Sequence, residues 1–116
     1  SKVSEGLNMA GAAKLAVAET FDSQGTFMNS NASYGLPGAA SISATYVSSI
    51  DADGSTAGGD GVIVIEYRAI GQGVTSGEAV SLVPDTSQPG AMAWTCTTTG
   101  LTNQIDARFL PANCRN

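Results

Sequence analysis

The sequence predicts an α+β domain in which an N-terminal α-helix packs on a roughly four-stranded antiparallel sheet. Residues 1–24 repeat apolar side chains with the period of a helix, on a stripe made of Val3, Leu7, Ala10, Val17 and Phe21. Four segments of strand character follow, and turns containing Gly or Pro separate them without an intervening helix. Short connections favour antiparallel pairing, so a single helix then covers one face of the sheet.

The helix carries two apolar surfaces. Its main stripe is expected to hold it on the sheet through four larger side chains, Val3, Leu7, Val17 and Phe21. A second set lies away from that stripe and consists of Met9, Ala12, Leu15 and Ala16. A helix that is apolar on two sides needs a second partner, so we expect this set to form an assembly face against neighbouring subunits. The alternative is a solvated face on which alanine merely favours the helix.

The ends of the elements follow from local signals. Ser1 is the expected N-cap and Gly25 the C-terminal stop of the helix, while Lys14 falls within the stripe and must reach water or a carboxylate at its edge. Residues 26–41 form a long loop. Strands are predicted at residues 42–50, 62–70, 79–83 and 91–97, with turns at 51–61, 71–77 and 84–90, so residues 1–116 make one domain.

Composition excludes most catalytic chemistry. The 116 residues carry a net charge of −5 and include no histidine, which removes Ser-His-Asp triads, Cys-His pairs and His-ligated metal sites. No activated nucleophile or general base accompanies any Ser or Thr, so we expect neither an enzyme nor a cofactor or metal. Five Lys and Arg residues give no broad basic surface for nucleic acid or anionic membrane.

The core is expected to be thin and to need a covalent staple. Val, Ile, Leu and Phe together supply 23 of the 116 residues. A disulfide between Cys96 and Cys114 would close a loop of 17 intervening residues and require an oxidising compartment. The alternative is two unlinked thiols in a cytoplasmic protein.

Several short motifs have simple interpretations. The run Asp51-Ala52-Asp53-Gly54-Ser55 is expected to be a polar hairpin turn, although Asp60 could join the two aspartates around a cation. Asn31-Ala32-Ser33 matches the N-glycosylation triplet, which we expect to be a chance match.

Two pairs of charged side chains outside the helix have alternative interpretations. Glu66 and Arg68 share a strand face, as in a cross-strand ion pair or a solvated face. Arg108 and Arg115 are the basic pair near the end of the chain, either solvated or hydrogen-bonded within the loop, or in weak contact with DNA phosphates or a host surface.

Both ends of the chain resemble one protein family. Trp94-Thr95-Cys96 and the run Phe109-Leu110-Pro111-Ala112-Asn113-Cys114-Arg115 are similar to the C-terminal end of bacterial type IVa major pilins. Ser4-Glu5-Gly6-Leu7, Ala12-Ala13-Lys14 and Val17 resemble the solvent-side half of the pilin N-terminal helix. The resemblance implies a disulfide-bounded loop over residues 96–114 and a structural subunit that assembles with copies of itself into a helical filament.

The same resemblance implies an extracellular pilus with roles in twitching motility, adhesion and DNA uptake, and an assembly machinery as a partner. Family members also carry an apolar N-terminal half of the helix, which holds the subunit in the inner membrane before assembly. This chain lacks that half, so we expect Ser1 to be a boundary within the helix of a soluble globular part. The alternatives are a minor pilin, a type II secretion pseudopilin, and a secreted binding module such as a carbohydrate-binding sandwich.

Overall fold

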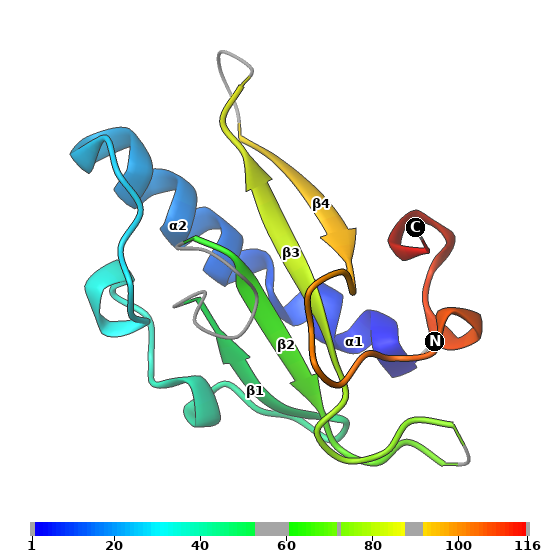
Figure 1. Ribbon diagram of the computed structural model, residues 1–116. Coiled ribbons are helices and arrows are strands. Elements are labelled where there is room, and N and C mark those ends of the chain that lie inside the picture. Colours follow the sequence, from blue (N-terminus) through cyan, green and yellow to red (C-terminus); the bar gives the residue numbers. More distant parts are fainter. Residues whose placement is uncertain (1, 53–60, 72, 88–91, 116) are drawn as a thin grey trace.

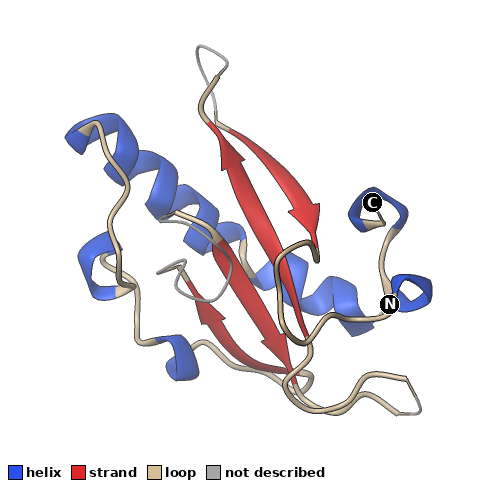
Figure 2. Cartoon of the chain, viewed as in Figure 1, coloured by secondary structure: helices blue, strands red, loops and turns tan. Residues whose placement is uncertain are grey.

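The computed structural model describes residues 2–52, 61–71, 73–87 and 92–115 and places the helical N-terminus across one face of a four-stranded antiparallel sheet (Figure 1). This arrangement confirms the predicted fold class. The helical segments are α1 (Lys2–Met9) and α2 (Gly11–Gln24), and the strands lie in the order β1 (Val47–Asp51), β2 (Ile63–Tyr67), β3 (Ala79–Asp85) and β4 (Ala93–Thr97). Figure 2 shows α1 and α2 behind the sheet and the short helices beside it.

The predicted single helix is interrupted once, at Ala10. The ψ of Ala10 is −5°, away from the α-helical value of about −42°. The Ala10 N–H still donates to the Gly6 carbonyl at 3.0 Å, so helical hydrogen bonding continues from α1 to α2. We call the two helices together the rod. Gly25 ends α2 as predicted, with φ of 74° and its N–H on the Phe21 carbonyl at 2.8 Å. The predicted N-cap, Ser1, lies outside the described residues.

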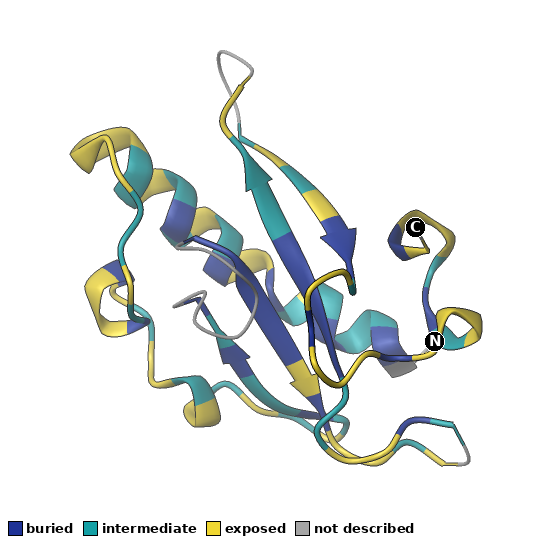
Figure 3. Cartoon of the chain, viewed as in Figure 1, coloured by how far each residue is buried: buried dark blue, intermediate teal, exposed yellow. Residues whose placement is uncertain are grey.

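The core lies between the rod and the sheet. Small or branched side chains of the rod, Val3, Ala10, Ala13 and Val17, are buried against the inward-facing side chains of the sheet, which include Ile63, Ile65, Val80 and Leu82. Figure 3 shows the resulting concentration of buried residues in β2 and β3. Close approach of the rod to the sheet is possible because alanine or glycine occupies three of its five buried positions.

Two members of the predicted helix–sheet set lie at the margin of this core. Leu7 is half-buried and packs against the core. Phe21 is half-buried in the last turn of α2, where its ring stacks on Phe27 at 4.5 Å between centroids. The expectation that Phe21 holds the helix on the sheet is therefore corrected: its ring clamps the end of α2 to the following loop.

Several strand boundaries differ from the predicted ones, most of all the start of β1 and the end of β2. β1 begins at Val47, five residues after the predicted start, because the half-buried Ile42 and Ala44 pack on the core from a loop. The alternation of apolar and polar residues over 42–46 resembles that of a strand, although this segment pairs with no strand in the described structure. β2 ends at Tyr67, whose carbonyl accepts the Gly77 N–H at 2.9 Å, and Ile70 lies beyond the strand in an isolated antiparallel bridge with Val74.

β3 continues through Pro84 and Asp85, which were predicted to lie in a turn. The Glu78 carbonyl accepts the Tyr67 N–H, so the even-numbered backbone groups of β3 face β2. The register of β2 and β3 ends at Ile63 opposite Leu82. The nitrogen of Pro84, which has no hydrogen to donate, points toward β2 at a position that β2 does not reach. No hydrogen bond between the strands is therefore lost there.

The long loop is fastened to β1 by Asn31, which sequence reasoning considered only as a glycosylation acceptor. Asn31 is buried, and its Nδ2 donates to the carbonyls of Pro37 and Ile50, each at 3.0 Å. Its Oδ1 accepts the Ala52 N–H at 2.7 Å. These bonds occupy both amide hydrogens, one of which a glycan would replace, and they protect the free edge of β1.

We expect Asn31→Ala to lower the free energy of unfolding by about 2 kcal/mol, because it leaves the buried Ala52 N–H and Ile50 carbonyl without their partner. Urea denaturation of the variant measures this loss. The matched control is Asn29→Ala, since Asn29 is exposed two residues away and its replacement is expected to change stability by less than about 0.5 kcal/mol. Equal stabilities for the two variants would contradict the anchoring role.

Candidate functional site

The candidate assembly face lies on the side of α2 away from the sheet. Leu15 is 61% exposed and is the single large hydrophobic side chain exposed among the described residues. Ala12, one turn before it, is exposed as well. The two residues therefore present an apolar surface to solvent, while α2 keeps Ala13 and Val17 buried on its opposite side.

The other two residues predicted for this face are only partly available. Met9 and Ala16 are half-buried and pack against the core, so they flank the surface rather than form its centre. The side chain of Lys14, which was predicted to fall within the main apolar stripe, is half-buried. We call the exposed pair, Ala12 and Leu15, the assembly face below.

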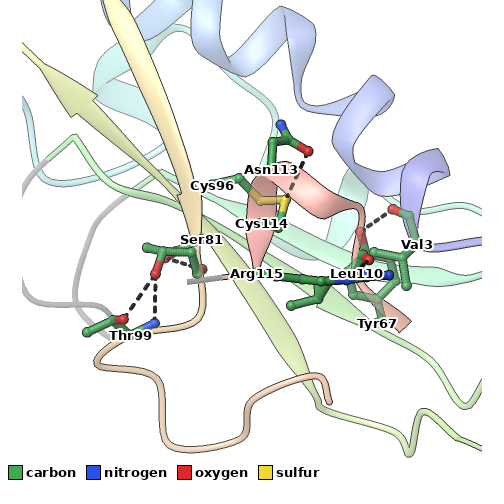
Figure 4. Close-up of a disulfide and its surroundings, with 10 residues drawn as sticks. Val3, Tyr67, Ser81, Cys96, Thr99, Leu110, Asn113, Cys114 and Arg115 are labelled. Carbon is green, nitrogen blue, oxygen red and sulfur yellow. Dashed lines mark hydrogen bonds between the residues drawn. A yellow bond between two sulfur atoms is a disulfide. The ribbon is translucent and has the colours of Figure 1, made fainter. Parts of the chain in front are cut away.

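α1 is fixed to the sheet by polar contacts that sequence reasoning missed. The buried Tyr67 hydroxyl donates to the Val3 carbonyl at 2.6 Å, and Glu5 Oε1 accepts the Tyr46 N–H at 3.2 Å (Figure 4 shows the first of these). Burial raises the pKa of Tyr67 above its usual range, and the nearby Glu5 carboxylate raises it further, so this hydroxyl stays protonated as a donor. Gly6 gives the room for this approach, since a Cβ there would overlap Tyr67.

The C-terminal loop is held by the predicted disulfide. Cys96 at the end of β4 is bonded to Cys114, with their Cα atoms 4.7 Å apart, and both residues are buried (Figure 4). The short helices η3 (Ala107–Phe109) and η4 (Ala112–Cys114) lie within the loop. The structure thus confirms the pairing of Cys96 with Cys114.

Noncovalent contacts tie the rest of the loop to the domain. The Ala79 N–H donates to the Asn103 carbonyl at 2.9 Å, which adds one short parallel contact at the start of β3. Ile105 and Leu110 are buried in the main core. The Phe109 ring fills the place of a Cβ at Gly73, so this loop is locked against the hairpin between β2 and β3.

The basic pair is occupied within the loop. Arg108 lies 3.7 Å from Asp106 in an exposed ion pair, and its guanidinium sits 5.0 Å from the centre of the Phe109 ring. Arg115 Nε donates to the Leu110 carbonyl at 2.9 Å. These contacts match a role inside the loop, which was one of the two interpretations.

The last two observations concern the possible cation turn and the membrane. Residues 53–60, which include Asp53 and Asp60 of the possible cation turn, lie outside the described residues. Among the helices that the structure describes, none has the length and hydropathy needed to cross a bilayer.

Comparison with known proteins identifies the family. A family model described as Pilin (bacterial filament) matches residues 1–115. The chain is also 35% identical over 118 aligned positions to the fimbrial protein EcpC of Eikenella corrodens, in an alignment that covers all of this chain and 70% of that protein. The helix on a four-stranded sheet and the disulfide-bounded end agree with this match. The chain therefore belongs to the bacterial type IV pilins, the structural subunits of extracellular pilus filaments.

Proposed function

We propose that the assembly face, Ala12 and Leu15, is a surface through which copies of this subunit pack in the pilus. The exposure of Leu15 carries this proposal, because burying a leucine side chain contributes about 1.5–3 kcal/mol. Ala12 supports it, since a small side chain lets a neighbouring helix approach closely. The same contact repeats at every subunit of a filament.

We propose that the assembly face contacts a different surface of the neighbouring copy. The assembly face lies on α2, on the helix side of the sheet. The segment after β4 crosses the opposite face of β2 and β3, far from α2 (Figure 1). A contact between two different surfaces of identical copies is heterologous, and repetition without closure gives a helical filament. The long loop and the disulfide-bounded loop then form the outer surface.

Leu15→Asp is expected to abolish or strongly reduce surface pili, because a carboxylate would be buried without a partner in the proposed contact. The subunit itself is expected to keep its stability within about 0.5 kcal/mol, since Leu15 is largely exposed. Pili sheared from cells that express the variant, compared with its total cellular amount, measure the effect.

The matched control is Leu15→Met, which keeps an apolar side chain of similar size and is expected to assemble normally. Normal piliation by Leu15→Asp would refute the role of this face. Thermal melting of the purified chain separates an assembly defect from misfolding.

We further propose that the pilus serves twitching motility and surface adhesion, with DNA uptake as an additional role, and that separate assembly machinery handles the subunit. An inner-membrane stage before assembly, through an apolar segment preceding Ser1, belongs to the same proposal. These roles rest on the family resemblance, and the subunit needs no enzymatic activity for them. Deletion of the gene is expected to abolish twitching zones, and complementation restores them; unchanged motility and attachment in the deletion strain would contradict both main roles.

A further inference from the structure

An open cavity of about 110 Å³ lies on the sheet face that the helices do not cover. Val64 and Ala79, from neighbouring strands, and Leu101 from the C-terminal loop supply its apolar walls. These three side chains belong to a small cluster separate from the main core. Figure 1 shows the segment after β4 crossing this face of β2 and β3, with the helices behind. The cavity is thus independent of the assembly face.

Three polar side chains surround the apolar walls: Glu66, Thr102 and Asn103. All three residues are exposed. Arg68, which was predicted to share a strand face with Glu66, donates through its Nε to the Ala44 carbonyl at 3.2 Å. Within the described ranges, no side chain donates to the Glu66 carboxylate, and the side chains of Thr102 and Asn103 make no hydrogen bond.

The chemistry of this rim selects the class of ligand. The Glu66 carboxylate accepts hydrogen bonds and carries negative charge, which disfavours an anion. The Thr102 hydroxyl and the Asn103 amide oxygen can accept as well. A primary ammonium has three donors, which matches these three acceptors. The apolar walls suit the aliphatic stem of such a cation.

We propose that this cavity binds the side chain of a lysine on a partner protein. The stem lies along Val64, Ala79 and Leu101, and the ammonium reaches Glu66 at the rim. The net charge of −5 on the chain favours the approach of a basic partner. Glu66 makes the decisive contact, because it is the one charged side chain among the described residues that line the cavity.

Titration of the ¹⁵N-labelled 116-residue chain with Nα-acetyl-lysine amide tests the proposal. Saturable shifts are expected for the amides of Gly77, Ala79 and Asn103, which lie around the cavity. Acetyl-norleucine amide has a similar aliphatic chain without the ammonium and is expected to leave these amides in place. Shifts of equal size with both probes, or no shifts with the lysine probe, would overturn the proposal.

A pair of isosteric variants isolates the charge. Glu66→Gln keeps the shape of the side chain, and we expect it to weaken binding roughly tenfold, the effect of losing a charged hydrogen bond. Glu19→Gln removes an exposed carboxylate from α2 and is expected to bind like the parent chain. Unchanged binding by Glu66→Gln would show that the Glu66 carboxylate does not hold the ammonium, and equal weakening by both variants would show that the probe responds only to overall charge; either result overturns the site. The amide spectra confirm that each variant is folded.

Discussion

Replacing Gly6 with alanine is expected to lower the free energy of unfolding by about 1–3 kcal/mol, the usual cost of overpacking a dense core. A Cβ at this position would lie 2.8 Å from Ile65 Cγ2 and would overlap the hydroxyl end of Tyr67. Neither neighbour can move freely, because Ile65 is fully buried and the Tyr67 hydroxyl is bonded to the Val3 carbonyl. The variant must therefore shift α1 away from the sheet. Chemical denaturation measures the loss.

Gly11→Ala provides a control with the opposite sign. A Cβ on Gly11 meets no atom within 4 Å, and the residue lies exposed in the first turn of α2. Alanine there is expected to stabilise the domain by about 0.5–1 kcal/mol through helix propensity alone. Equal stabilisation by Gly6→Ala would refute the close approach of α1 to the sheet.

Removing the disulfide is the second large change. We expect Cys96→Ala combined with Cys114→Ala to cost about 3 kcal/mol, because the unfolded chain regains the freedom that the closed loop restricts. For a domain of this size, the melting temperature is expected to fall on the order of 10–20 °C. Thermal denaturation of the parent chain with and without dithiothreitol gives the same comparison.

The double variant also serves as the control for the reductant. Its melting temperature is expected to be the same with and without dithiothreitol, since it has no disulfide to lose. A parent chain that melts at one temperature under both conditions would show that the loop needs no covalent closure. Ile105 and Leu110 would then be sufficient to hold it.

The sequence predicted the elements of this fold better than their ends. Periodicity located the helix and the four strands, and Gly25 marked the helix end, because both signals are local. The start of β1 at Val47 and the extension of β3 through Pro84 depend on where the neighbouring strand begins and ends. Local patterns carry no information about that neighbour.

The candidate sites also divide into features that the local sequence predicts and features that depend on distant residues. The pairing of Cys96 with Cys114 was predictable because the chain contains two cysteines. Leu15 was predictable as an apolar residue off the main stripe. The roles of Asn31 and Tyr67 were not, since each depends on backbone groups far away in the sequence. A glycine inside a helix, as at Gly6, was the one available signal of close backbone approach.

The central claim is that the assembly face is buried between subunits in the pilus, and thiol labelling of Leu15→Cys tests it most directly. Ala40→Cys is the control, because Ala40 is exposed in the long loop that we place on the outer surface. We predict that Leu15→Cys reacts with a maleimide in the dissociated subunit and is protected in intact pili, while Ala40→Cys reacts in both. Equal labelling of Leu15→Cys in subunits and intact pili would contradict the account.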